Sequence, residues 1–115
     1  MPPKKSDNAL ELEHNKAREH VIVTGAGSGI GKEFVKLFLQ DGANVLAVSL
    51  IDEELNALKE EFSGYSGMLC TLKIDLSKEN ACELVENWCQ ENRWSVDTLV
   101  NNAGFAIYSE CVECD

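Results

Sequence analysis

The sequence lacks long apolar runs and is short of basic residues. No stretch of its 115 residues approaches the roughly 20 apolar residues of a membrane-spanning helix. Its first five residues lead into polar residues rather than into the apolar core of a signal peptide. Ten Lys and Arg stand against 20 Asp and Glu, for a net charge of −10. A surface this acidic repels phosphate backbones and anionic lipid, so we expect neither nucleic acid nor a membrane as a partner.

The five cysteines make an odd number, which does not suit a framework of disulfides. With no export signal, an odd count favours free thiols in a reducing compartment, and we expect a cytoplasmic protein. Cys111 and Cys114 form a lone Cys-x-x-Cys without the second pair or the histidines of a structural zinc site, so no metal is expected. Cys82 and Cys89 lie seven residues apart and are interpreted as packing residues on one helix face.

The 44% of apolar residues suits one folded domain rather than a disordered chain. Residues 1–19 mix Pro, Lys, Asn and Glu without apolar periodicity and predict a flexible polar arm, whereas residues 20–115 predict the domain. Within the domain, four apolar runs predict buried strands. They cover Val21–Val23, Val45–Val48, Met68–Leu72 and Val96–Val100.

Helical patterns separate these predicted strands. The first helix should end at Gly42, the second should begin at Asp52, and the third should begin with Ser77 as N-cap. Their buried faces are expected to carry Ile30, Phe34, Leu37 and Phe38 in the first, Leu55, Leu58 and Phe62 in the second, and Ala81, Leu84, Val85 and Trp88 in the third. The alternation predicts an α/β fold with a Rossmann-like parallel sheet of order 3-2-1-4, its first two helices on one face and its third on the other.

The segment Thr24-Gly25-Ala26-Gly27-Ser28-Gly29-Ile30-Gly31 joins the first strand to the first helix. Glycines at such a turn permit positive φ angles and close backbone approach, and the helix amino terminus offers free N–H groups to a pyrophosphate. A tight turn without a ligand is the alternative. Four glycines in seven residues are costly in backbone entropy, however, unless something approaches the loop closely.

The spacing Thr-Gly-x-x-x-Gly-Ile-Gly resembles the phosphate-binding loop of the short-chain dehydrogenase/reductase family. Two further segments are similar to motifs of that family and occur in the same order: Asp75-Leu76 after the third strand, and Asn101-Asn102-Ala103-Gly104 after the fourth. The resemblance runs from about His20 to Tyr108. It implies a parent activity in which a nicotinamide dinucleotide and an alcohol or carbonyl substrate exchange a hydride.

The resemblance also implies which residues bind the dinucleotide. The loop would be shaped by Gly25, Gly29 and Gly31, with the backbone around Ser28 and Ile30 facing the pyrophosphate. Adenine would be held by Asp75 and Leu76, although Asp75 is also explained as a helix-entry cap. The floor beneath the adenosine ribose would be formed by Asn102, Ala103 and Gly104, with the Asn101 and Asn102 side chains tying the fourth strand into the sheet.

The choice between NAD and NADP stays open. Family members that favour NAD usually carry an acid at the end of the second strand, where it binds the ribose hydroxyls and repels a 2′-phosphate. That position is Ser49, which suits a hydroxyl or a phosphate, and Leu50 after it offers no guanidinium. Asp52 would repel a 2′-phosphate if its loop bends inward, and is otherwise the N-cap of the second helix. The balance slightly favours NAD.

The catalytic residues of the family are missing from this sequence. The family uses a Ser, an Asn and a Tyr four residues before a Lys, all beyond Asn-Asn-Ala-Gly, with the Tyr as acid/base. Only eleven residues follow Gly104, and the fourth residues after Tyr65 and Tyr108 are Leu69 and Val112. We therefore expect a cofactor-binding portion that is inactive on its own. The alternatives are a regulatory nucleotide-binding module that pairs with another chain, and a remnant that binds nothing.

A sheet that stops at the fourth strand leaves that strand as an unpaired edge. The second face carries only the third predicted helix and lacks the remaining helices that would cover it. The sequence therefore predicts self-association, or a partner chain, through the exposed strand edge.

Overall fold

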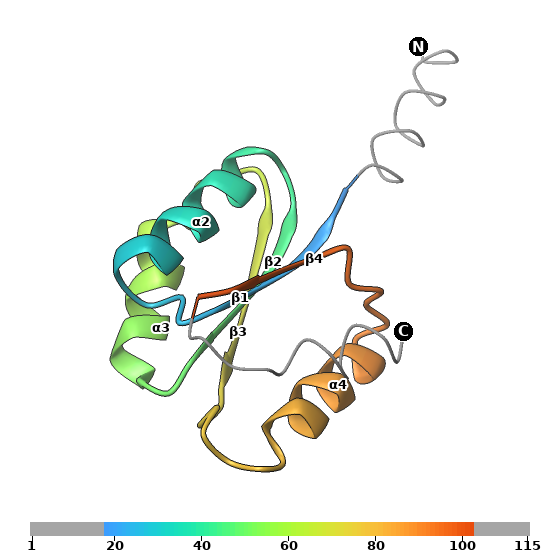
Figure 1. Ribbon diagram of the computed structural model, residues 1–115. Coiled ribbons are helices and arrows are strands. Elements are labelled where there is room, and N and C mark those ends of the chain that lie inside the picture. Colours follow the sequence, from blue (N-terminus) through green and yellow to red (C-terminus); the bar gives the residue numbers. More distant parts are fainter. Residues whose placement is uncertain (1–17, 103–115) are drawn as a thin grey trace, which may run out of the picture.

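The computed structural model describes residues 18–102 and contains one parallel sheet with helices on both faces (Figure 1). The sheet has the strand order β3-β2-β1-β4, which confirms the predicted α/β fold. Along the chain the elements are β1 (His20–Thr24), α2 (Gly29–Gln40), β2 (Asn44–Ser49), α3 (Asp52–Glu61), β3 (Met68–Lys73), α4 (Ala81–Glu91) and β4 (Thr98–Asn101).

The two central strands are buried along almost their whole length, because helices cover both of their faces. All six residues of β2 are buried, and so are the last four of β1. The register pairs Val21 with Val45 and Ile22 with Leu46. Such strands read as continuous apolar runs rather than as alternating ones, and this is why the sequence identified them.

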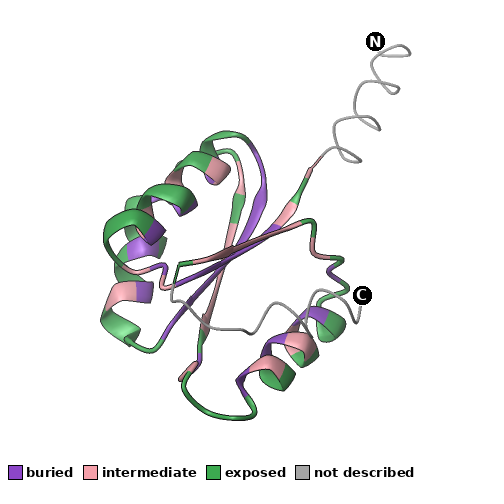
Figure 2. Cartoon of the chain, viewed as in Figure 1, coloured by how far each residue is buried: buried purple, intermediate pink, exposed green. Residues whose placement is uncertain are grey.

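Helices α2 and α3 cover one face of the sheet and α4 covers the other, as expected from right-handed crossovers (Figure 1). Successive strand residues therefore belong to two separate cores. Val21 and Val23 pack under α2 and α3, whereas Ile22 packs under α4. The buried residues in Figure 2 line the inner sides of the helices and the central strands.

The face that α2 buries differs from the predicted one. Ile30 and Leu37 expose 67% and 56% of their surface, and Phe34 is exposed as well. The buried residues of the helix are Gly31, Val35 and Leu39, and of the predicted face only Phe38 packs against the core, where it is partly buried. Both sets have helical spacing, so periodicity alone does not choose between them. Gly31 lies against the carbonyl oxygen of Gly25 with no room for a side chain, and this contact favours the observed rotation of the helix.

The helix starts also differ from the sequence expectation. The N-cap of α3 is Ile51 rather than Asp52, and the N-cap of α4 is Asn80 rather than Ser77. In α4 the predicted Leu84 is exposed, whereas Ala81, Val85 and Cys89 are buried. The predicted core residues of α3 are confirmed. Strand β4 begins two residues later than predicted, at Thr98.

The cysteines only partly follow the sequence argument. Neither Cys70 nor Cys89 forms a disulfide, and burial raises the pKa of the Cys70 thiol. Cys82 is disulfide-bonded, so the expectation of free thiols is wrong at this residue. A count of cysteines does not say which thiols meet in a fold. Both α4 cysteines face the core beneath that helix, as predicted.

None of the helices in residues 18–102 is long and apolar enough to cross a membrane.

Candidate functional site

Four segments with candidate residues meet at the carboxyl ends of the strands, because all four strands are parallel. Gly25 follows β1, Ser49 ends β2, Asp75 follows β3 and Asn102 follows β4. The sheet order reverses between β2 and β4, which lie on opposite sides of β1. Ligands of open α/β sheets bind outside the carboxyl ends of the strands at such a reversal.

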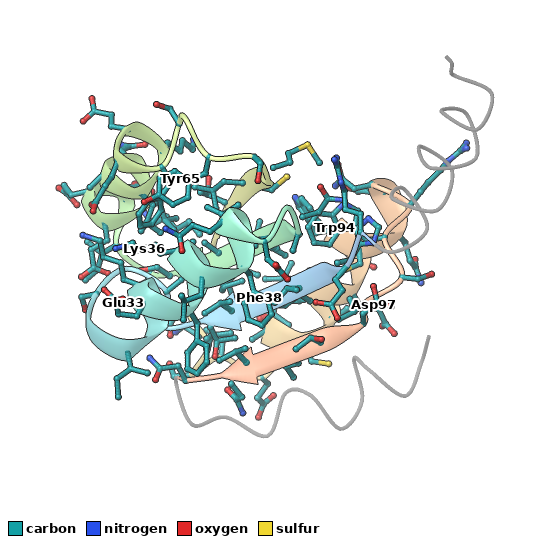
Figure 3. All side chains as sticks on the ribbon, turned by 90° about the horizontal axis from the view of Figure 1, so that it is seen from above. Glu33, Lys36, Phe38, Tyr65, Trp94 and Asp97 are labelled. Carbon is teal, nitrogen blue, oxygen red and sulfur yellow. The ribbon has the colours of Figure 1, made fainter. Side chains whose placement is uncertain are left out.

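The amino ends of the strands, at the opposite end of the sheet, carry contacts that do not involve the candidate residues. His20, at the start of β1, donates its backbone N–H to the Asp97 carboxylate over 2.9 Å. The His20 ring also meets the Trp94 ring edge-on, with 4.7 Å between the centroids. Figure 3 shows Trp94 and Asp97 together at this end of β1, away from the glycine loop.

The loop between β1 and α2 depends on glycine at two positions with positive φ. Gly25 has a φ of 61° and Gly29 a φ of 59°, in a region that residues with a side chain rarely adopt. Between them, the backbone N–H of Ala26 donates to the carbonyl of Val48 over 3.2 Å and ties the loop to the end of β2. This hydrogen bond and the two positive φ angles together define the path of the loop.

A third glycine, Gly31, is required by close packing rather than by its φ angle. A Cβ built on Gly31 would overlap the carbonyl oxygen of Gly25 and lie 3.0 Å from Nδ2 of Asn102. That same Nδ2 donates a hydrogen bond to the Gly25 carbonyl oxygen over 3.2 Å. The first turn of α2, the loop and the end of β4 are thus packed into one unit.

The amino terminus of α2 is open to solvent and carries no internal cap. Ser28 precedes the helix in an extended conformation and its side chain makes no capping hydrogen bond. The first turn contains no acidic residue, and Ser28, Gly29 and Ile30 are exposed. The first N–H groups of a helix have no partner within the helix, and they attract anions together with the helix dipole. This end of α2 is suited to bind a phosphate group.

Strand β4 is connected to β1 by a buried hydroxyl. Thr24 is fully buried, and its Oγ1 donates to Oδ1 of Asn101 over 3.0 Å, with the Val100 carbonyl a second acceptor at 3.4 Å. Together with the bond from Asn102, this places both asparagines at the junction of β4 with the loop. The other two residues of the predicted floor, Ala103 and Gly104, lie outside the described residues.

Asp75 lies in a turn between β3 and α4. Its Oδ1 accepts hydrogen bonds from the hydroxyl of Ser77 at 2.6 Å and from the backbone N–H of Ser77 at 3.0 Å. These bonds lower the pKa of the Asp75 carboxyl below its ordinary value. Asp75 is not the cap of α4, which begins six residues later at Ala81 with Asn80 as N-cap. Leu76, the other predicted adenine contact, is half-buried and packs toward the core under α4.

At the end of β2 the structure reveals a residue that sequence reasoning missed. Ser49 is buried, and its hydroxyl donates to Oε1 of Glu54 over 3.1 Å while accepting the backbone N–H of Ile51. The Glu54 side chain also covers the loop, since a Cβ built on Gly27 would lie 2.6 Å from its Cδ. The only signal for this contact was an acid in the first turn of the second predicted helix.

A groove of about 550 Å³ follows the outer side of α2 and does not reach Ser49, Asp75 or Asn102. Its lining is formed by Gly29, Ile30, Lys32, Glu33, Phe34, Lys36, Leu37, Glu61 and Phe62. Figure 3 shows Glu33 and Lys36 on this helix.

Comparison with known proteins gives consistent matches. The family model described as short chain dehydrogenase matches residues 19–115. The 3beta-hydroxysteroid dehydrogenase 2 of Eggerthella lenta is 38% identical over 96 residues, which covers 82% of this chain and 37% of that protein. The chain spans about a third of the length of the curated relatives it matches.

Solved structures share the fold. A metagenomic short-chain oxidoreductase in complex with NADP is 30% identical, with a TM-score of 0.69, and the match covers 76% of this chain and 39% of that one. L-sorbose reductase from Gluconobacter frateurii, complexed with NADPH and L-sorbose, has a TM-score of 0.70 over 76% of this chain and 34% of that one. At 22% identity, the second match supports the fold alone.

Proposed function

Because the chain belongs to the short-chain dehydrogenase family, we propose that it binds a nicotinamide dinucleotide at the carboxyl ends of its strands. The pyrophosphate lies at the amino terminus of α2, adenine lies beside Asp75 and Leu76, and the adenosine ribose lies between Ser49 and the Asn102 segment. We propose the chain as the cofactor-binding portion of an oxidoreductase. Its reaction is hydride transfer between that cofactor and an alcohol or carbonyl substrate.

One observation carries the proposal: the amino terminus of α2 is exposed, uncapped and free of acids, and the packing of glycines holds it in place. Gly31 fits against Gly25 and Asn102 with no room for a side chain. The extended Ser28 makes no side-chain capping bond to the first N–H groups of the helix, and Ser28, Gly29 and Ile30 are exposed. A ligand-free tight turn does not need an exposed helix terminus without a cap or an acid, whereas a bound pyrophosphate uses one.

The proposal covers binding and not turnover by these 115 residues. Neither tyrosine of the sequence is followed by a lysine at the fourth position. A Tyr whose pKa is lowered by a neighbouring Lys supplies the acid/base step in this family. The chain therefore binds the dinucleotide without oxidising or reducing a substrate by itself.

Of the two dinucleotides, the chain binds NAD in preference to NADP. Support comes from the acids Asp52, Glu53 and Glu54, which form the first turn of α3 directly after β2 ends. A 2′-phosphate on the adenosine ribose would bring up to two further negative charges to this acidic end of the strand.

A charge placed at the α2 terminus tests the proposal. Ser28→Asp puts a carboxylate where the pyrophosphate binds, while aspartate is as good an N-cap as serine. The folded state keeps its melting temperature or gains slightly from the helix dipole. Calorimetric titration should then show that the affinity for NAD⁺ falls by about tenfold or more.

Ser28→Asn is the matched control, because asparagine has the same shape as aspartate without the charge. It should bind NAD⁺ within a few fold of the unchanged chain. The proposal fails if the folded, unchanged chain binds no dinucleotide at millimolar concentration. It also fails if Ser28→Asp binds as tightly as Ser28→Asn.

A further inference from the structure

The end of β2 carries an unusual combination of groups, a neutral serine where an acid is expected and a carboxylate supplied from the neighbouring helix. We infer that Glu54, and not the residue at the end of β2, selects NAD over NADP in this chain. The inference rests on the proposed dinucleotide site. It assigns the discrimination to a residue of α3 that approaches the loop from the side.

The position of Glu54 is fixed by two neighbours. Its Oε1 accepts the hydroxyl of Ser49 over 3.1 Å, and its side chain lies against Gly27 in the glycine loop so closely that a Cβ there would overlap it. Gly27 therefore serves a purpose that the phosphate-loop spacing does not explain, since it leaves room for Glu54. The carboxylate fills the angle between the loop and the end of β2.

Ser49 itself has no hydrogen-bond donor left for a phosphate. Its single O–H is given to Glu54, and its oxygen accepts the backbone N–H of Ile51 over 3.1 Å. A serine hydroxyl has one donor, so Ser49 cannot also donate to a 2′-phosphate without giving up Glu54. The 2′-hydroxyl of NAD, in contrast, is itself a donor, and the Glu54 carboxylate has further lone pairs to accept it.

The other charges at this end of the sheet do not replace Glu54. Lys73, which is paired with Ser49 in the sheet register, is the cation beside it, and its Nζ binds the Asp52 carboxylate over 3.0 Å. That salt bridge occupies the one acid that the sequence had suggested as a barrier to NADP. Glu53 is exposed and lies on the same turn. The described groups Asp52, Glu53, Glu54 and Lys73 leave two net negative charges, and Glu54 is the acid in contact with the loop.

The experiment compares NAD⁺ and NADP⁺ binding to the purified 115-residue chain and to three variants by calorimetry. Glu54→Gln keeps the size of the side chain and its oxygen acceptor but removes the charge. Glu53→Gln removes the same charge from the same turn without touching the loop. Asp52→Asn removes the acid that holds Lys73. Thermal melts of all four proteins establish that they are folded.

The unchanged chain is expected to bind NAD⁺ about tenfold or more tighter than NADP⁺, since a carboxylate close to a phosphate costs about that much even in water. Glu54→Gln should lose most of this ratio by gaining affinity for NADP⁺, while Glu53→Gln keeps it. The inference is overturned if both Gln variants change the ratio equally, or if Asp52→Asn alone abolishes it. A chain that binds neither dinucleotide would refute the proposed function instead, so the two failures are distinguishable.

Discussion

Replacing Gly31 with alanine tests the closest packing in the site. Gly31 lies in the first turn of α2, and in an unconstrained helix alanine is more stable than glycine by about 0.5–1 kcal/mol. In this fold the new Cβ would overlap the carbonyl oxygen of Gly25 and lie 2.9 Å from its carbonyl carbon. A backbone carbonyl cannot rotate away as a flexible side chain does, so α2 must move away from the loop.

The expected cost follows from three contributions. Overpacking of a rigid site costs about 1–3 kcal/mol. Displacement of Asn102 sacrifices its hydrogen bond to Gly25, which contributes about 1 kcal/mol. Against these stands the helix propensity of alanine. The net loss is about 2 kcal/mol, which lowers the melting temperature of a domain of this size by about 10 °C.

Circular dichroism melts and urea titrations measure this loss. Gly64→Ala is the control, because a Cβ built on Gly64 meets nothing within 4 Å. It should change the free energy of unfolding by less than about 0.5 kcal/mol. If Gly31→Ala melts at or above the temperature of the unchanged chain, the packing of α2 onto Gly25 and Asn102 is refuted.

Two further predictions concern the adenine contact and the sheet edge. Asp75→Ala should lower the affinity for NAD⁺ about tenfold. Ser77→Ala breaks the turn but keeps the carboxylate, so it should leave the affinity unchanged. An equal loss in both variants would contradict the adenine contact of Asp75. Because Ser77 lowers the pKa of Asp75, this contribution should stay constant from about pH 8 to 5 and decline only as the pH falls through the lowered pKa. We also propose that β4, which pairs only with β1 within residues 18–102, mediates self-association. A sedimentation experiment that finds a monomer with a cooperative melt would contradict it.

The parallel sheet and the glycine loop could be predicted because their signals are local. The run Val21–Val23 is apolar on both faces, which only a doubly covered strand tolerates, and the glycines follow it at once. Alternation of strands and helices then leaves few topologies for the chain. The carboxyl ends of the strands consequently meet where the sequence placed them.

The rotation of α2 about its axis could not be derived from the hydrophobic pattern. The helix contains two overlapping apolar stripes, and the larger side chains of Ile30, Phe34 and Leu37 made the exposed stripe look like the core. The contact of Gly31 with Gly25 turns the helix so that Val35 faces the sheet instead. A glycine that the loop motif already required was therefore also the signal for the buried face.

Glu54 was missed because its contact depends on how two elements meet in space. It lies 27 residues beyond Gly27 in the sequence, and nothing local to either residue indicates the approach. The sequence argument considered Asp52 instead, since it is nearer to the end of β2. In the fold the Asp52 carboxylate binds Lys73. Glu54, two residues further along the first turn of α3, is the acid that contacts Ser49 and the glycine loop.

The bonds that complete the site join residues 77 positions apart, Gly25 with Asn102 and Thr24 with Asn101. During synthesis the glycine loop leaves the ribosome long before either asparagine does. Contacts of such long sequence separation form slowly, so the glycine loop forms before its hydrogen bond with Asn102. A dinucleotide that binds only the completed site would draw the chain toward the folded state by mass action. Cofactor supply would then act on the yield of folded protein, in addition to occupancy of the finished site.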